Sequence, residues 1–397
     1  MRRVTTPLRP RPGVRAWPLY VGGFLGPYAS TMVTPMVHEV ATGLAGTPEV
    51  TAAAVTAYML PFAAVMLVSG TLAERWGRAR TMQVSLVAFV GACVCCVLAP
   101  TVEWFLAARA LQGVTNAFTT PLLVAAITDL VPRAGLGRAL GFFAGMQAAG
   151  QAASPLVSGP SAALDWRLAF VFPAVVAVVL AVFPPTMTAG PRPAGPPPVR
   201  ALLNRNLALA CGLSFLCYLA AVGLTVLSIL RAEADFGLGP WQRGLLAAAF
   251  GVAGLLAAPL LGRRLDTLGP RRTGVLMNLL LAAGLLLAAL GPTVWLLGLG
   301  IAAVGAAVTG LRTTVNAVAA TSTVGNRAGA ASLALSAQFF GGALAPPVWV
   351  PLYAHAGAAG FAATAVAPVL ALALLAAVRV RSSGAAAPAR PDRAARR

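Results

Sequence analysis

The chain has 397 residues, of which 58% are hydrophobic and only 10% are charged, and its mean hydropathy is +0.82. A soluble domain carries about 25% charged residues. This composition excludes a soluble globular protein and indicates an integral membrane protein. The net charge of +19 does not indicate a nucleic-acid-binding protein, because the arginines lie in short clusters between apolar runs rather than on one basic domain.

Twelve apolar runs follow one another along the chain, and a helix needs about 20 apolar residues to cross the bilayer core. Helices are expected throughout, because lipid offers backbone N–H and C=O groups no other partner. The predicted fold class is therefore all-α integral membrane, with twelve transmembrane helices. In chain order the predicted spans are residues 17–37, 50–72, 80–99, 102–128, 137–160, 166–186, 206–230, 241–262, 273–290, 293–320, 327–352 and 356–379.

The sequence repeats itself at a nearly constant spacing. Gly70 in "GTLAERWGRAR" and Gly262 in "GRRLDTLGPRR" are 192 residues apart, and Pro155 and Pro346 are 191 residues apart. Internal repeats of this kind are typical of secondary transporters, and they predict two pseudo-symmetric six-helix bundles. The predicted divisions are a basic tail (1–16), an N-terminal bundle (17–186), a Pro-rich linker (187–205), a C-terminal bundle (206–379) and a second tail (380–397).

The arginines predict the orientation, because cytoplasmic loops carry an excess of positive charge. With the N-terminus inside, the cytoplasmic segments hold 24 arginines and the outer loops hold three, Arg167, Arg231 and Arg243. Both termini, the linker and the loop between spans 2 and 3 are then cytoplasmic. The chain has no lysine and is dominated by Ala, Gly, Pro and Arg, which is typical of GC-rich bacterial genes. We therefore expect a multi-pass protein of the bacterial cytoplasmic (inner) membrane.

The loop between spans 2 and 3 resembles a signature of the major facilitator superfamily, in the order Gly70, Glu74, Arg75, Gly77, Arg78 and Arg80. The family usually has Asp where Glu74 stands. Gly70 is expected to let two helices approach closely, and a carboxylate can cap the positive N-terminus of a neighbouring helix. The resemblance implies that this contact closes a cytoplasmic gate, with Asp266 at the position equivalent to Glu74. The alternative is that the arginines only anchor the loop to anionic lipid.

Asp129 ends the fourth predicted span, where a carboxylate opposes the helix dipole. It is therefore expected to have a basic partner, and Arg78, Arg80 and Arg133 are near it in the predicted topology. The resemblance implies the same charge link to the loop between spans 2 and 3. The alternative is an ordinary solvated helix end.

A polar stripe is predicted along the fourth span, where Arg109, Gly113, Asn116 and Thr120 recur at helical spacing. We expect this stripe to face a central cavity. The stretch "LAARALQG" also resembles the family's helix 4 motif, and the resemblance implies that Arg109 takes part in proton coupling. The alternative is a structural arginine bonded to backbone carbonyls. The other candidates for coupling or for the substrate cavity are Gln112 in the same motif, Tyr28, and a similar stripe formed by Arg312 and Asn316.

The stretch "GQAASPLVSG", residues 150–159, resembles the helix 5 signature of the drug/proton antiporter branch, with serines replacing two of its glycines. Its small residues are expected to allow close helix packing, and Pro155 is expected to kink the helix. This resemblance favours export over uptake. The packing residues are Gly150, Ser154, Pro155, Ser158 and Gly159.

The predicted function is secondary active transport, with proton-coupled export of small amphipathic molecules by a monomer. The sequence holds no nucleotide-binding loop, no catalytic set and no metal cluster, so we expect no cofactor, no enzymatic activity and an ion gradient as the energy source. All ten acidic residues lie at span edges or in loops, which favours neutral or anionic substrates. A facilitator or importer without proton antiport, and a transporter-like sensor or scaffold, remain open alternatives.

Overall fold

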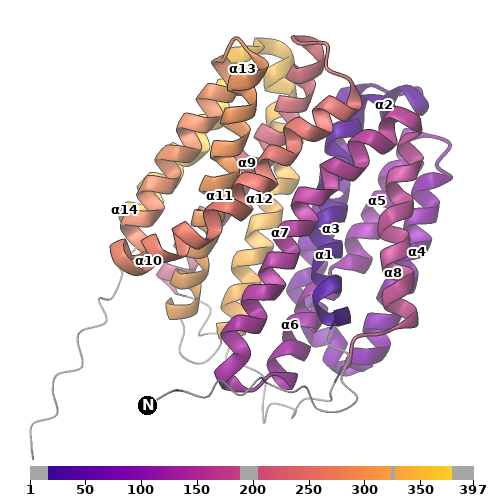
Figure 1. Cartoon of the computed structure of the whole chain (residues 1–397), viewed down its shortest axis with the longest axis vertical. Helices are drawn as coiled ribbons and strands as arrows, with labels where there is room; N and C mark the ends of the chain where they lie inside the picture. The colour runs from indigo at the N-terminus through magenta and orange to yellow at the C-terminus, as the bar shows by residue number, and fades with distance from the viewer. Residues whose placement is uncertain (1–16, 188–203, 323–326, 378–397) are drawn as a thin grey trace, which may run out of the picture.

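Helices account for nearly all of the residues that the computed structural model describes, which are 17–187, 204–322 and 327–377 (Figure 1). The first part of the chain forms α1 (Trp17–Thr31), η1 (Thr34–Met36), α2 (Val37–Gly43), α3 (Pro48–Trp76), α4 (Arg78–Val97), α5 (Val102–Asn116), α6 (Thr119–Leu130), α7 (Arg133–Leu164), η2 (Trp166–Phe170) and α8 (Val171–Val182). The second part forms α9 (Arg205–Ala234), α10 (Pro240–Leu290), α11 (Val294–Ser322), α12 (Arg327–Ala356), α13 (Ala358–Ala362), η4 (Ala363–Ala365) and α14 (Val366–Ala377).

Each of the twelve predicted spans is helical in the structure, and nine described segments are long and apolar enough to cross a membrane. The other three predicted spans correspond to α1 with η1 and the start of α2, to α7, and to η2 with α8. The first span is interrupted after Thr31, where Pro35 lies in a short 3-10 turn and has no N–H to donate. The fourth span is interrupted between Asn116 and Thr119.

The predicted spans 241–262 and 273–290 are joined by helical backbone rather than by an irregular loop, so α10 is one element. Its two arms nevertheless qualify as separate spans, Pro240–Ala258 and Arg271–Leu290. Gly254 in the first arm faces Thr309 of α11, whereas in the second arm Gly274 faces Thr314 and Gly284 faces Val304. The chain therefore reverses direction within α10, and its two arms lie on either side of α11 (Figure 1).

Close backbone contacts recur in the two halves at the spacing of the sequence repeat. Four of the glycines form two repeated contacts, in which an added Cβ would overlap a carbonyl oxygen of the neighbouring helix. The first half has two of these contacts, and the second half has two equivalent ones. In each equivalent contact, both the glycine and its partner lie 191 or 192 residues further along the chain. The pairs are Gly113 with Tyr58, Gly305 with Phe250, Gly150 with Phe24, and Gly341 with Phe215. Equivalent helices therefore make equivalent contacts.

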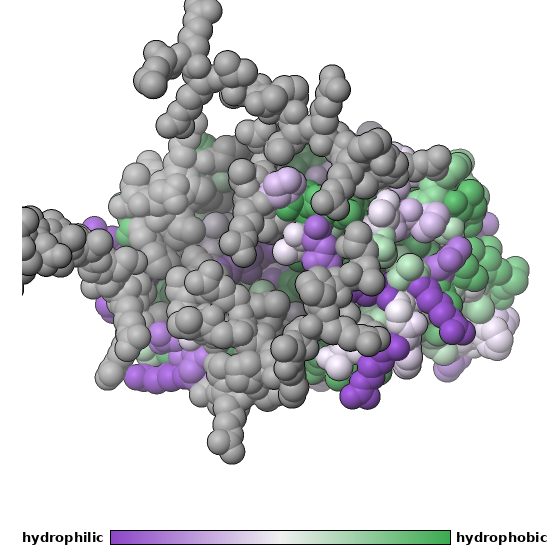
Figure 2. All heavy atoms as spheres, turned by 90° about the horizontal axis from the view of Figure 1, so that it is seen from below, coloured by the Kyte–Doolittle hydropathy of each residue, from purple (hydrophilic) through white to green (hydrophobic). Residues whose placement is uncertain are grey.

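Large apolar side chains remain exposed along the flanks of the bundle, as expected of surface that faces lipid. Exposed tryptophans lie at the ends of helices: Trp17 begins α1, Trp76 ends α3, and Trp104, Trp241 and Trp295 lie in the first turns of α5, α10 and α11. Tryptophan is enriched at both membrane–water interfaces. Figure 2 shows the lower end, where hydrophilic side chains gather beside the hydrophobic flank.

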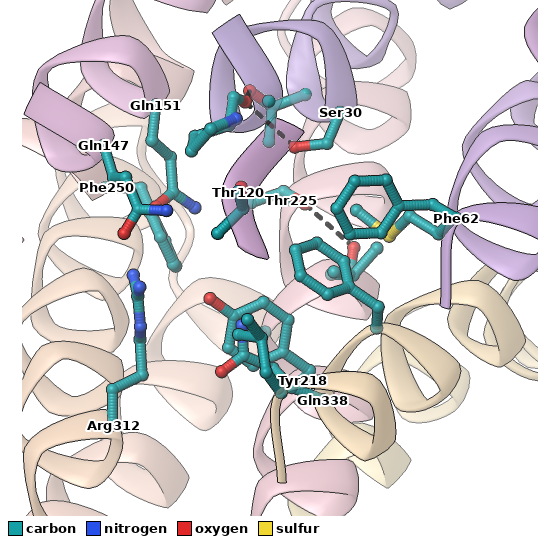
Figure 3. Close-up of a pocket in the computed structure, with 18 residues that line it drawn as sticks. Ser30, Phe62, Thr120, Gln147, Gln151, Tyr218, Thr225, Phe250, Arg312 and Gln338 are labelled. Carbon is teal, nitrogen blue, oxygen red and sulfur yellow. Dashed lines mark hydrogen bonds between the residues drawn. The ribbon is translucent and has the colours of Figure 1, made fainter. Parts of the chain in front are cut away.

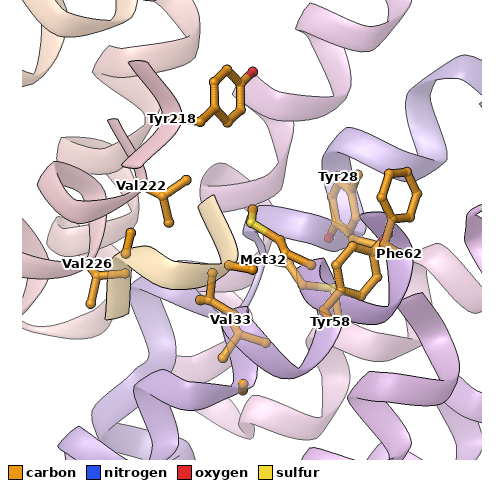
Figure 4. Close-up of a cluster of buried hydrophobic side chains, with 14 of the residues drawn as sticks. Tyr28, Met32, Val33, Tyr58, Phe62, Tyr218, Val222 and Val226 are labelled. Atoms are coloured by element: carbon orange, nitrogen blue, oxygen red, sulfur yellow. The ribbon is translucent and has the colours of Figure 1, made fainter. Parts of the chain in front are cut away.

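The two halves pack against each other along two pairs of helices, α3 with α12 and α7 with α10. Thr56 donates a hydrogen bond of 2.6 Å to the carbonyl of Ala343, and Ser336 donates one of 2.7 Å to the carbonyl of Ala63. One hydrophobic cluster runs across both halves: Figure 4 shows Met32 and Val33 of the first half near Val222 and Val226 of α9. The interface between the halves is therefore built from small polar bonds and apolar packing.

We predict that Gly113→Ala lowers the stability of the protein by about 1–3 kcal/mol, the usual cost of overpacking. The added methyl group would have to displace the backbone of Tyr58, because no flexible side chain can move aside for it. Gly91→Ala is the matched control, since a Cβ there meets no atom within 4 Å. Thermal unfolding in detergent measures both variants. Equal melting temperatures for the two would contradict the packing role of Gly113.

Candidate functional site

A cavity lies between the two halves and is lined by helices from both, α1, α3, α6 and α7 on one side and α9 to α12 on the other. It encloses about 680 Å³, including space open to solvent. Its lining combines aromatic rings with hydroxyl and amide groups. The polar and aromatic residues among its lining are Ser30, Thr31, Phe62, Thr120, Gln147, Gln151, Tyr218, Thr225, Phe250, Arg312, Gln338 and Phe339.

Arg312 is the only charged residue among the 18 that line this cavity. Figure 3 shows its side chain extending from α11 toward Gln147 of α7, with Tyr218 and Gln338 beside the cavity on the same half as Arg312. A guanidinium presents its donors in a planar fork that suits carboxylate and phosphate oxygens. Together with the amide of Gln147, it offers hydrogen-bond donors from both halves to one bound molecule.

Arg109 lies in a different environment, fully buried within the first half. Its guanidinium donates to Oε1 of Gln112 at 2.6 Å and to the carbonyl of Ala29 at 3.0 Å, and it stacks 4.6 Å from the centre of the Tyr58 ring. Gln112 in turn donates to Sγ of Cys93 at 3.0 Å. These contacts tie α5 to α1, α3 and α4.

The expectation that one polar stripe on the fourth span faces the cavity is therefore met only in part. Thr120 lines the cavity, whereas Arg109 and Asn116 are fully buried and are not among its lining residues. Asn116 donates to the hydroxyl of Tyr58 at 2.6 Å, and Gly113 packs on the Tyr58 backbone. The ring of Tyr58 also lies over the guanidinium of Arg109, so this one side chain of α3 covers both residues.

Two further cavity candidates also lie elsewhere. Tyr28 is fully buried, and its ring packs between Phe24 and Phe172 at 5.5 Å and 5.0 Å. Asn316 is exposed, and it does not line the cavity although Arg312 lies one turn before it. Helical spacing places residues on one face, but it does not show which neighbour that face meets.

At the lower end, the motif between the second and third spans forms a tight connection from α3 to α4. Gly77 is the single residue between the two helices, and its φ of +91° is a conformation that other residues rarely adopt. Arg78 donates to Oδ2 of Asp129 at 2.6 Å, which is the basic partner that the sequence predicted for this carboxylate. The ion pair fixes the start of α4 to the end of α6.

Other parts of the gate motif are less defined in this structure. Among the described residues, a Cβ at Gly70 meets no atom within 4 Å, so they show no close helix approach there. Gly70 lies on an exposed face of α3, and Arg75 and Arg80 are exposed as well. The side chains of Glu74 and Asp266 lie outside the described part of the structure. The gate therefore stays a prediction, and the Arg78–Asp129 ion pair is the one predicted contact of this region that the described residues show.

The small residues of α7 pack on both of its neighbours. Ser154 donates to the carbonyl of Tyr28 at 2.8 Å, on the face that also brings Gly150 onto α1. Ser158 donates back to the carbonyl of Ser154 at 2.9 Å. On the opposite face, a Cβ at Gly159 would lie 2.8 Å from the Cα of Gly244 in α10.

On that same face of α7, Pro155 presents its carbonyl to Gly244. Residues 150–159 thus bring α7 into contact with α1 on one face and with α10 on the other.

A charged cluster that the sequence did not indicate lies at the upper end, between the halves. Arg243, at the start of α10, is 2% exposed and binds Glu39 of α2 as well as Glu233 of α9, the latter at 2.5 Å. His38 of α2 lies 2.9 Å from Glu233. We call these four residues the upper cluster. The sequence placed Arg243 in an outer loop and the acidic residues at span edges or in loops. An arginine on the outer side was the only indication of this cluster.

Comparison with known proteins agrees with this architecture. The chain matches the Major Facilitator Superfamily over residues 19–239 and again over residues 209–397. The chain belongs to the Major Facilitator Superfamily. Members of this family are membrane transporters rather than enzymes, and the apolar helices of the described residues agree with a multi-pass membrane protein. The two overlapping matches also agree with the internal repeat.

Individual relatives are distant. An uncharacterized MFS-type transporter of Mycobacterium tuberculosis, Rv1877, is 29% identical over 251 residues, which are 61% of this chain and 36% of that protein. The puromycin resistance protein pur8 of Streptomyces alboniger is 34% identical over 127 residues, which are 32% of this chain and 25% of that protein. This chain thus matches about a third of the length of such relatives or less.

A solved structure shares the fold across most of the chain. It is a bacterial homologue of the human lysosomal transporter Spinster in an inward-facing, occupied conformation, with a TM-score of 0.72 at 15% identity. The match covers 91% of this chain and 96% of that one. This similarity supports the major facilitator fold of the transporter.

We predict that Arg243→Gln weakens the contact between the halves of this transporter at its upper end. Glutamine cannot neutralise the two carboxylates, and leaving buried charges unpaired is costly. Solvent accessibility of the upper end of the cavity should rise, measured by labelling a cysteine placed at Thr225, which lines the cavity. Arg167→Gln is the control, because the partners of Arg167 are Asp165, the carbonyl of Val97 and the ring of Trp166, all in the first half. Unchanged labelling in Arg243→Gln would contradict a role in closure.

Proposed function

We propose that this transporter exports small amphipathic molecules, neutral or anionic, in exchange for protons. The observation that carries the proposal is the cavity between the halves, whose aromatic rings suit an apolar body and whose only charged lining residue is the cation Arg312. A cationic substrate would meet a like charge there, whereas an anionic group would gain a charge-assisted hydrogen bond.

Export is supported by the resemblance of residues 150–159 to the drug/proton antiporter branch and by relatives such as the puromycin resistance protein. The excess of arginine at the lower end supports a cytoplasmic position for that end, in the bacterial inner membrane with both termini cytoplasmic. The recurring glycine contacts support two functional halves, residues 17–186 and 206–379, that rock against each other in a monomer.

We predict that Arg312→Gln lowers the transport of an anionic probe by about tenfold or more, because a hydrogen bond to a charged group is worth about 1.5–3 kcal/mol. The variant keeps an amide donor but loses the charge. Flux in proteoliposomes is measured with carboxyfluorescein, and rhodamine 123 is a cationic dye of similar ring size. Preferential transport of the cation by the unsubstituted protein would contradict the proposed substrate class.

Arg109 is the proposed coupling residue, since it is a buried cation linked to α1, α3 and α4. We predict that Arg109→Lys folds and binds the probe but loses about tenfold or more of its gradient-driven flux. Lysine keeps the charge and loses the planar fork that reaches Gln112 and Ala29 together. The structural alternative predicts misfolding, or normal flux once the amount of protein is matched. Normal pH-dependent flux in a folded variant would exclude Arg109 as the coupling residue.

One reconstitution experiment separates the three classes of function. Proteoliposomes with an imposed pH gradient are loaded with neutral, anionic and cationic dyes, and proton and dye movements are followed together. Coupled movement of protons and dye supports the antiporter. Dye movement that ignores the pH gradient indicates a facilitator, and the absence of any movement favours a sensor or scaffold.

A further inference from the structure

The upper cluster joins the two halves through charged side chains, of which Arg243 is buried and the two carboxylates are partly exposed. Arg243 is held between two carboxylates, Glu39 from the first half and Glu233 from the second, and is almost completely removed from solvent. Directly beside it, a Cβ at Gly244 would lie 2.5 Å from the carbonyl oxygen of Pro155 and 3.0 Å from the Cα of Gly159. The charged contact thus lies next to the closest backbone approach between α7 and α10. Any movement that separates the halves at this end must break it.

The charges of the upper cluster do not balance while His38 is neutral. Two carboxylates face one guanidinium, which leaves one excess negative charge. Nδ1 of His38 lies 2.9 Å from Oε1 of Glu233. A neutral imidazole with its hydrogen on Nδ1 can donate that bond, but only the doubly protonated imidazolium brings the charge that neutralises the cluster.

The neighbouring charged groups do not supply this charge. Arg231 and Asp235 of α9 pair with each other at 2.9 Å, and Arg167 and Asp165 beside α7 pair at 3.8 Å. Each of these pairs is neutral as a whole. Arg231 also donates to the carbonyls of Ala288 and Gly291. The other titratable groups near the upper end are Glu49 in the first turn of α3, Glu103 in the first turn of α5, and Tyr353 and His355 near the end of α12.

His38 can exchange protons with the medium while the cluster is closed. Its side chain is 47% exposed, whereas Arg243 beneath it is 2% exposed. Imidazole is the side chain that changes its charge between about pH 5 and 8. The cluster therefore combines a buried link between the halves with one accessible protonation site.

We propose that His38 is a proton-binding site of the upper cluster, and that protonation of His38 stabilises the closed arrangement of the upper end. The imidazolium gains the attraction of Glu233 only when the halves are together. By linkage, closure favours protonation and protonation favours closure to the same extent. Mild acid on the upper side then holds that side shut, and alkaline medium loosens it. This site regulates the conformation and does not require that protons be transported.

The test measures the distance across the upper end at different pH values, without substrate and without a gradient. Spin labels are attached to cysteines at Thr42 of α2 and Ala234 of α9, both exposed, in nanodiscs that hold the full chain. The five native cysteines lie in α4 and α9 and are buried or half-buried, and the unsubstituted protein gives their labelling background. The ratio of short to long distances reports closure.

Between pH 8 and pH 6 we expect that ratio to rise about two- to five-fold, a size that matches a partly exposed ion pair. His38→Gln should abolish the rise, because glutamine keeps a donor but cannot take up the charge. His355→Gln is the matched control: it removes the chain's other histidine, which bonds only to Pro351 of its own helix at 2.8 Å, and should leave the rise intact.

Three results would overturn the proposal. They are a pH-independent ratio in the unsubstituted protein, an unchanged pH response in His38→Gln, and an equal loss of response in His355→Gln. If His38→Gln does not fold, Glu233→Gln serves instead. It keeps His38 but removes the facing charge, so a surviving pH response in that variant would exclude the site. Because no gradient or substrate is present, these results are independent of whether the proposed transport takes place.

Discussion

Backbone-to-backbone contact at glycines is the constraint on which the rest of this structure depends. Lipid tails are as apolar as leucine, so helices in a membrane gain little from burying apolar side chains against one another and rely on close packing instead. Gly113 and Gly150 bring α5 onto α3 and α7 onto α1, and Gly305 and Gly341 repeat these contacts in the second half. The cavity lies where the two sets of helices face each other.

Three buried or half-buried arginines occupy three distinct levels of this framework. Arg109 is enclosed within the first half, Arg312 lines the cavity, and Arg243 joins the halves at the upper end. Each has a different kind of neighbour: Arg109 has an amide, a carbonyl and an aromatic ring, Arg312 has the cavity, and Arg243 has two carboxylates. A buried charge is stable only where its surroundings compensate for lost hydration, and these neighbours suit the coupling, binding and closing roles proposed for the three arginines.

The contacts between the halves combine small polar bonds with apolar packing. Single hydroxyl-to-carbonyl bonds link α3 to α12, glycines bring α7 onto α10, and one charged cluster closes the upper end. This suits a protein whose halves must move against each other around a central cavity, as alternating access requires.

Composition and spacing along the chain were enough to predict the membrane class, the twelve spans, the repeat and a basic partner for Asp129, with Arg78 as one of three candidates. The sequence placed Arg109 and Thr120 on one stripe, but the ring of Tyr58 covers Arg109, and no periodicity along the chain shows that contact. Only the tertiary structure decided that Arg312 reaches the cavity and that Glu39 meets Arg243. Those two residues lie 204 positions apart, and folding alone brings charges from two different halves into one buried cluster.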